Sequence, residues 1–154
     1  MPGERAQLAT FLARFDPPIG RLARAILSRL RTRMPSANQL VYDNYNALAI
    51  GFAATERASD VIVSLALYPR WVSLFLMHGV GLPDPQKLLR GKGTQVRHIV
   101  LQSAKDLDDP AIVSLMRAAL LQAKTPPPKP GAGKTVIKSV SSKQRPRRPA
   151  PDKQ

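Results

Sequence analysis

The sequence predicts an α+β protein in which an antiparallel sheet of about four strands packs with two N-terminal helices and one C-terminal helix. Apolar residues alternate in short runs in the middle of the chain, as they do in strands, and recur at helical spacing near both ends. The 154 residues are 44% hydrophobic, which is enough to bury one ordinary core. Composition changes near residue 125, so we expect a domain over 1–124 and a Pro-rich, basic, disordered tail over 125–154.

Prolines mark the boundaries of the expected helices. A first helix over 4–15 stops before Pro17, because the residue that precedes a proline disfavours helical geometry. A second helix runs from about 18 to 33, since proline is tolerated in a first turn. A third helix follows two aspartates and runs over about 110–123, because acidic residues complement the dipole at a helix start.

Three of the expected strands pair through one hairpin and its neighbour. The stretch 61–78 forms two strands around a turn over 68–71, and a strand over 47–53 pairs with the first of them. A fourth strand is expected over 96–101, and the residues 40–46 form a polar-aromatic entry into the sheet. Directly opposed residues point the same way, so this pairing defines one aliphatic face. Its members are Leu48, Ile50, Phe52, Val63, Leu65, Leu67, Val72, Leu74 and Leu76.

The opposite face of these strands is different in kind. Alanine and glycine from 47–53 join Ser64 and Ala66 in a floor of small side chains, which is rimmed by Tyr68, Trp71, Phe75 and Met77. A second helix layer packed closely on this floor would explain the small residues. A ligand groove would explain both the small residues and the aromatic rim.

The segment 88–98 gathers three cations, two glycines, a hydroxyl and an imidazole. Glycines let backbone N–H groups approach an oxyanion, and arginine and lysine supply charge. An ordinary exposed hairpin loop has the same composition. Our leading hypothesis is a non-catalytic module that binds a small anionic ligand or anionic partner through this loop and the aromatic rim. The expected ligand-binding residues are Tyr68, Arg70, Trp71, Phe75, Arg90, Lys92, Thr94, Arg97 and His98.

The tail supports an alternative function. The chain carries a formal charge of +14, and the tail is its most basic part. Such a tail fits nonspecific attraction to nucleic-acid phosphates through Lys143, Arg145, Arg147 and Arg148, or a solubilising extension without a partner. The short apolar run over 136–140 is the exception, and fits a transient edge strand or a docking peptide.

Several function classes lack their signatures. The chain has no cysteine, and His78 and His98 do not lie at metal-ligand spacing, so we expect neither a metal site nor a cofactor. We find no nucleophile, base and acid set typical of a hydrolase. Nothing approaches the roughly 20 consecutive apolar residues of a transmembrane helix, and we therefore expect a cytoplasmic protein without membrane contact.

Three short motifs occur in the order seen in a known family. They are Val41 to Leu48 with Gly51 and Phe52, then Tyr68 to Trp71, then Gly91 to Thr94 with Val96 to Ile99. With them the chain resembles the YdhG-like family of small bacterial domains of unknown function, over roughly 15–123. The resemblance implies an α+β domain with an antiparallel sheet. One branch of that family implies frataxin-like iron handling, for which Asp106, Asp108 and Asp109 are the candidate ligands here.

Overall fold

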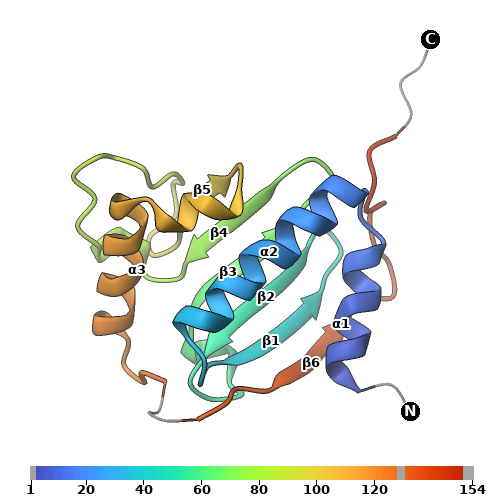
Figure 1. The fold of residues 1–154 in the computed structure, drawn as a ribbon, viewed down its shortest axis with the longest axis horizontal. Coiled ribbons are helices and arrows are strands. Elements are labelled where there is room, and N and C mark those ends of the chain that lie inside the picture. Colours follow the sequence, from blue (N-terminus) through green and yellow to red (C-terminus); the bar gives the residue numbers. More distant parts are fainter. Residues whose placement is uncertain (1–2, 128–130, 151–154) are drawn as a thin grey trace.

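The predicted α+β class is confirmed by a computed structural model, which describes residues 3–127 and 131–150 (Figure 1). Within these residues the chain forms three α-helices and a six-stranded mixed sheet. The helices are α1 (Glu4–Ala13), α2 (Pro17–Arg33) and α3 (Pro110–Gln122). The strands are β1 (Asn38–Asp43), β2 (Leu48–Ala53), β3 (Val61–Leu67), β4 (Val72–Leu76), β5 (Arg97–Leu101) and β6 (Thr135–Val140). Their order across the sheet is β5-β4-β3-β2-β1-β6.

The central hairpin has the register that the alternation of residues predicts. Leu67 pairs with Val72, and Leu65 pairs with Leu74 across the β3–β4 ladder. The turn closes with a hydrogen bond of 2.9 Å from the amide of Tyr68 to the carbonyl of Trp71. The pairing of β2 with β3 also confirms the aliphatic face, because Ile50 lies opposite Leu65.

The sheet has two more strands than the sequence predicts, and one of them is parallel. The first is β1, which pairs antiparallel with β2. Its pattern is hard to identify as a strand because two polar residues, Gln39 and Asp43, are buried on the same side as Val41. Both are satisfied internally, Gln39 by the guanidinium of Arg31 at 2.9 Å and Asp43 by arginines described below.

The second additional strand is β6, which runs parallel to β1. It falls on the apolar run over 136–140, so of the two expectations for that run the edge strand is the one the structure contains. The physical reason is the free backbone edge of β1, which offers hydrogen bonds that a polar segment with few apolar residues can take. Beyond the pairing, the side chain of Ile137 packs against the main core and its amide donates to the carboxylate of Glu4 in α1.

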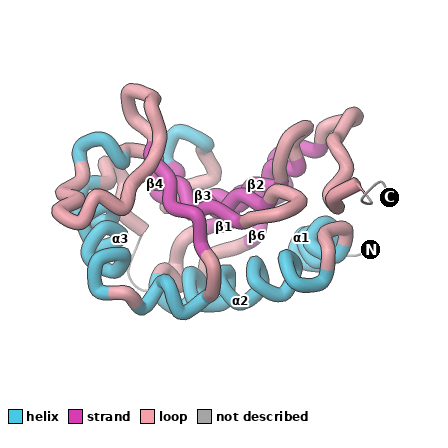
Figure 2. Tube along the Cα trace, turned by 90° about the horizontal axis from the view of Figure 1, so that it is seen from above, coloured by secondary structure: helices cyan, strands magenta, loops and turns pink. Residues whose placement is uncertain are grey.

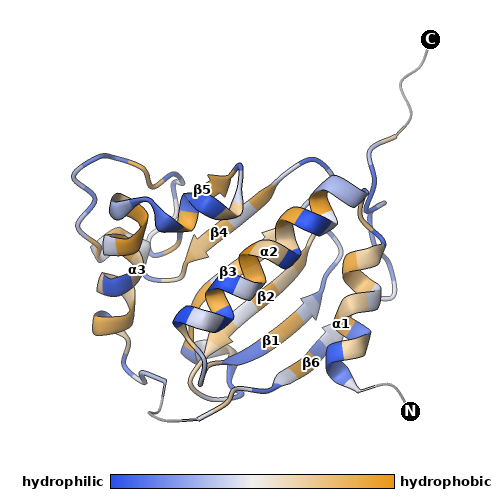
Figure 3. Cartoon of the chain, viewed as in Figure 1, coloured by the Kyte–Doolittle hydropathy of each residue, from blue (hydrophilic) through white to orange (hydrophobic). Residues whose placement is uncertain are grey.

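The three α-helices all lie on one side of the sheet, as Figure 2 shows. Phe15, Ile26 and Leu30 of this layer are no more than 2% exposed and join the aliphatic face of the strands in one core. Hydrophilic residues occupy the outer side of α2 (Figure 3), which is the amphipathic pattern of a helix with one buried face. The other side of the sheet carries loops and short 3-10 turns.

Candidate ligand-binding face

The face of small residues is open in the described part of the chain, and no α-helix packs on it (Figure 2). The interpretation of a covering helix layer is therefore wrong for these residues. A pocket of about 600 Å³ lies on this face, over β1 to β4. Its lining comprises Tyr42, Asn44, Tyr45, Asn46, Ala47, Ala49, Gly51, Ala58, Val61, Ser64, Ala66, Tyr68, Phe75, Met77 and Ser141.

Small side chains on neighbouring strands form the floor of the pocket. Ala49 pairs with Ala66, and Gly51 pairs with Ser64, so the four residues lie together on one face. At Gly51 a Cβ atom would come within 2.9 Å of both methyl groups of Val61. Larger side chains at these four positions would fill the pocket or displace the residues around it.

Aromatic side chains form the walls. Tyr42, Tyr45, Tyr68 and Phe75 come from four different segments, and Met77 completes the apolar lining. Burial raises the pKa of Tyr42 and of Tyr68 above the usual tyrosine value, because an ionised phenolate is poorly solvated there. Both hydroxyl groups therefore remain protonated at neutral pH. The hydroxyl of Tyr42 is also buried without a hydrogen-bond partner among the described residues.

Two ring pairs extend the walls along the sheet. The rings of Tyr68 and Trp71 stack with their centroids 4.7 Å apart, and Trp71 is 44% exposed. The rings of Phe75 and His98 lie 5.2 Å apart on neighbouring strands, because these residues pair directly. The structure thus brings these four of the predicted ligand-binding residues to the open face, and Tyr68 and Phe75 line the pocket itself.

The predicted anion loop is divided by the sheet. Arg97 pairs with Leu76 of the aliphatic face, whereas its neighbour His98 pairs with Phe75 of the open face. Because successive side chains in a strand alternate, Arg97 and His98 cannot serve the same site. The guanidinium of Arg97 instead donates to the carbonyls of Gly93 at 2.6 Å and Val96 at 2.9 Å, which closes its own loop. The structure therefore does not bring Arg97 together with Phe75 on the open face.

The remaining predicted cations lie near the face but outside the pocket. Arg90 forms a short antiparallel bridge with His98, so its exposed side chain leaves on the open face. Arg70 is exposed in the turn between Tyr68 and Trp71. Lys92 and Thr94 are exposed in the loop before β5 and do not line the pocket.

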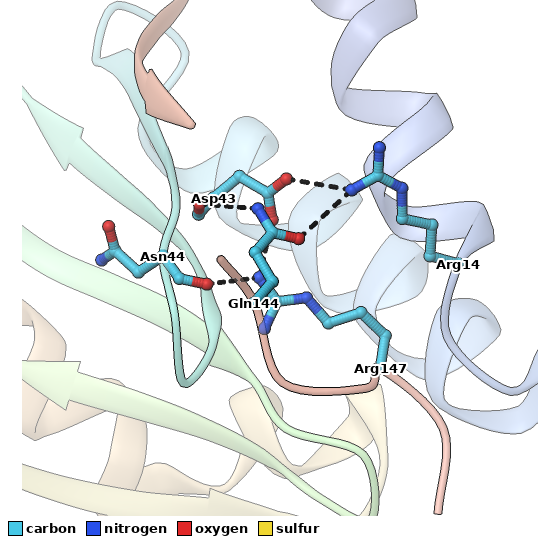
Figure 4. A network of polar contacts seen from close by, with 5 residues as sticks. All are labelled: Arg14, Asp43, Asn44, Gln144 and Arg147. Atoms are coloured by element: carbon cyan, nitrogen blue, oxygen red, sulfur yellow. Dashed lines mark hydrogen bonds and ion pairs between the residues drawn. The ribbon is translucent and has the colours of Figure 1, made fainter. Parts of the chain in front are cut away.

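The C-terminal segment is fastened beside the pocket by a buried ion pair (Figure 4). The carboxylate of Asp43 lies 2.8 Å from the guanidinium of Arg147 and 3.2 Å from that of Arg14, and the Asp43 side chain is 1% exposed. The side-chain amide of Gln144 donates to the carbonyl of Asp43 at 3.0 Å, and Arg147 also donates to the carbonyl of Asn44. The side chain of Arg147 is itself only 5% exposed. The sequence predicted it as a phosphate-binding residue, but here its guanidinium is occupied by Asp43.

The other tail cations differ in their surroundings. The guanidinium of Arg145 lies 5.5 Å from the ring centre of Tyr45, and its amide donates to the carbonyl of Tyr45 at 2.9 Å. Arg148 lies 3.7 Å from Asp16 and donates to the carbonyl of Arg14 at 3.1 Å. Lys143 is exposed. Of the four predicted phosphate-binding residues, Arg145 is the one that the structure brings to the pocket wall.

The aspartates suggested as iron ligands have structural roles. Asp106 accepts the amides of Gln102 and Ser103 at 2.7 and 3.2 Å at the start of a 3-10 helix. Asp108 lies 2.8 Å from Arg33 and also pairs with Arg29, whose hydrogen bond holds the pKa of Asp108 below its usual value. Asp109 accepts the amide of Ala111 at 2.9 Å as a helix cap. Over residues 3–127 and 131–150 no group of three His, Cys, Asp or Glu side chains could hold a metal ion.

Sequence reasoning missed seven residues of the pocket, of which Ala58 and Val61 lie at the entry into β3. Tyr42, Asn44, Tyr45 and Asn46 lie in the polar-aromatic stretch 40–46, so an aromatic cluster beside asparagines was the available signal. Ser141 carried no such signal, because it reaches the pocket only through the pairing of β6 with β1.

Comparison with protein-family models, with curated proteins and with solved structures gave no match to this chain. Membership of the YdhG-like family therefore stays a prediction. Among the residues described, no helix combines the length and the apolar character needed to cross a bilayer.

Proposed function

We propose that this chain is a non-catalytic binding module and that its binding site is the open face of the sheet. The observation that carries the proposal is the pocket of about 600 Å³, which has a floor of small residues and walls of aromatic ones. Ligand pockets are typically mostly apolar cavities of this size with a few polar groups that fix orientation. Here the neutral hydroxyls of Tyr42 and Tyr68 and the amides of Asn44 and Asn46 are such groups.

The distribution of charge suggests what kind of ligand fits. None of the described residues that line the pocket is charged. The cations lie at its ends instead, with Arg145 over the ring of Tyr45 and Arg90 opposite His98. A ligand with a flat, uncharged ring and an acidic group matches this pattern, because the ring can lie on the floor while the acidic group stays at the rim.

The proposal can be tested with anilinonaphthalene sulfonate, a probe that combines a flat ring system with an anionic group and fluoresces on apolar surfaces. We expect saturable one-to-one binding by the native chain. The substitution Ser64→Phe puts a ring on the floor, where Ser64 is only partly buried. It should lower the affinity for the probe by about tenfold or more, equivalent to a loss of roughly 1.4 kcal/mol of binding free energy.

A matched control adds the same ring elsewhere. Ala25 is exposed on α2, on the other side of the sheet, so Ala25→Phe should leave the affinity unchanged. Circular dichroism establishes that both variants are folded. Equal affinity of the native chain and a folded Ser64→Phe variant would show that the probe binds elsewhere and would contradict the proposed site.

A further inference from the structure

Resting on the proposed function, we infer that the open face binds single-stranded nucleic acid, with an unpaired base in the pocket and the flanking phosphates held by Arg145 and Arg90. This assigns the nucleic-acid contact to the sheet rather than to the tail as a whole. It follows from three features of the face: its exposed rings, the sign of the charges around it, and its shape.

The first feature is the supply of exposed aromatic rings at one end of the strands. Tyr45 is 49% exposed in the β1–β2 turn and Trp71 is 44% exposed in the β3–β4 turn. Between them, Tyr68 stacks on Trp71 and lines the pocket. Proteins that bind single strands use such rings as stacking platforms, because every base presents a π face whatever its sequence.

The second feature is that positive and negative charges are separated. Arg70 and Arg145 are exposed beside the rings, whereas Arg90 is exposed opposite His98, towards the other end of β4. Among the described residues none of these three arginines has a carboxylate partner. The acids of the β2–β3 loop, Glu56 and Asp60, pair with Lys134 and Arg57 at the other end of these strands. The free charge at the ringed end is therefore positive, as a phosphate backbone requires.

The third feature favours a single strand over a duplex. The pocket is lined by uncharged residues and is closed at its floor, so it accepts the faces and edges of a ring rather than a phosphate. In a duplex the bases are stacked and paired, and their faces are not available. Connecting segments also rise on both sides of the open face (Figure 2), which suits a narrow strand laid along it.

The inference can be tested by fluorescence anisotropy of the full chain with a labelled single-stranded DNA of mixed sequence, about 12 nucleotides long, which matches the site sizes of stacking domains. Removing a stacking ring by Trp71→Ala should weaken binding about tenfold, and Tyr45→Ser gives a second test at a more exposed position. Arg145→Gln should weaken binding and lower the slope of log affinity against log salt concentration by about one.

A matched control uses a cation outside the face. Arg117 is exposed on α3, on the helix side of the sheet, and Arg117→Gln should leave affinity and salt dependence unchanged. Equal losses in Arg117→Gln and Arg145→Gln would overturn the inference, since they would indicate a general charge effect. So would equal binding of the duplex form of the probe, or full retention of binding by folded Trp71→Ala and Tyr45→Ser variants.

Three further results relate this inference to the proposed function, and the first two separate them. If the native chain binds anilinonaphthalene sulfonate at the pocket but not the DNA strand, the inference fails and the proposed site stands. If adenosine monophosphate competes as strongly as the strand, the ligand is a free nucleotide and the inference of a strand is overturned. If Ser64→Phe abolishes strand binding and Ala25→Phe does not, both are supported.

Discussion

At the scale of single residues, Asp43 shows how an acidic side chain is tolerated inside this molecule. It lies on the helix-covered side of β1, next to Leu48 in the ladder, and is 1% exposed. A carboxylate buried there without a partner would be strongly destabilising, whereas two arginines and their hydrogen bonds offset that cost. The ion pair with Asp43 thus holds the C-terminal segment against the domain where that segment has few apolar residues to bury.

We expect Arg147→Ala to lower the free energy of unfolding by about 3 kcal/mol, because it leaves a buried carboxylate with one partner, Arg14, at 3.2 Å. Urea unfolding followed by the fluorescence of Trp71 measures this change. The matched control is Arg148→Ala, which removes a half-exposed contact to Asp16 and should cost less than about 1 kcal/mol. Similar losses of unfolding free energy in the two variants would show that the buried pair with Asp43 contributes no more to stability than an exposed one.

At the scale of elements, the strands that could be predicted are those whose residues alternate cleanly. Leu65 and Leu74 face the core while Ser64 and Ser73 face away, and this contrast fixes the register of β3 and β4. In β1 the contrast is lost, because Gln39 and Asp43 lie on the core side and their partners come from distant segments. No local pattern reports such partners.

β6 and the pocket illustrate the same limit. The apolar run over 136–140 is compatible with an edge strand or a docking peptide, and what selects the strand is the backbone edge of β1. The sequence correctly placed Tyr68 and Phe75 on the face of small residues, since that needs only the hairpin register. Grouping them with Arg97 required knowledge of the register of β5 with β4, which the sequence did not contain.

β6 depends on a close backbone approach at Gly133. A Cβ atom there would lie 1.7 Å from the carbonyl oxygen of Ala37, which is backbone and cannot rotate away. We expect Gly133→Ala to lower the free energy of unfolding by about 1–3 kcal/mol, the usual cost of overpacking. It should also speed hydrogen exchange at the amide of Gln39, which donates to the carbonyl of Lys134 at 2.8 Å.

The matched control for this substitution is Gly93→Ala, because a Cβ atom at Gly93 has nothing within 4 Å. It should change the stability by less than about 0.5 kcal/mol, as is usual for surface substitutions. Native exchange rates at Gln39 in a folded Gly133→Ala variant would mean that β6 is not held through this contact.

At the scale of the whole molecule, the two faces of one sheet serve different purposes. The face with Ile50 and Leu65 binds the helices and supplies the core, which stabilises the fold through apolar burial. The other face keeps small residues and exposed rings, and a smaller cluster around Leu40, Ala53 and Val61 supports one end of it. The C-terminal segment joins the two functions, because it is anchored at Asp43 on the core side and supplies Ser141 to the pocket.

This connection distinguishes a separable tail from a structural part of the domain. A chain that ends at Pro127 loses β6 and Arg147. We expect it to be destabilised by more than about 3 kcal/mol, since the loss of one partner of a buried ion pair alone has that effect.

The shortened chain should also self-associate, because the edge of β1 is then unpaired. Urea unfolding and sedimentation at several concentrations measure both effects, and a chain that ends at Ala150 is the control. A Pro127 chain as stable and as monomeric as this control would establish that the tail is separable, and deleting it would then be a clean test of nucleic-acid binding through its lysines and arginines.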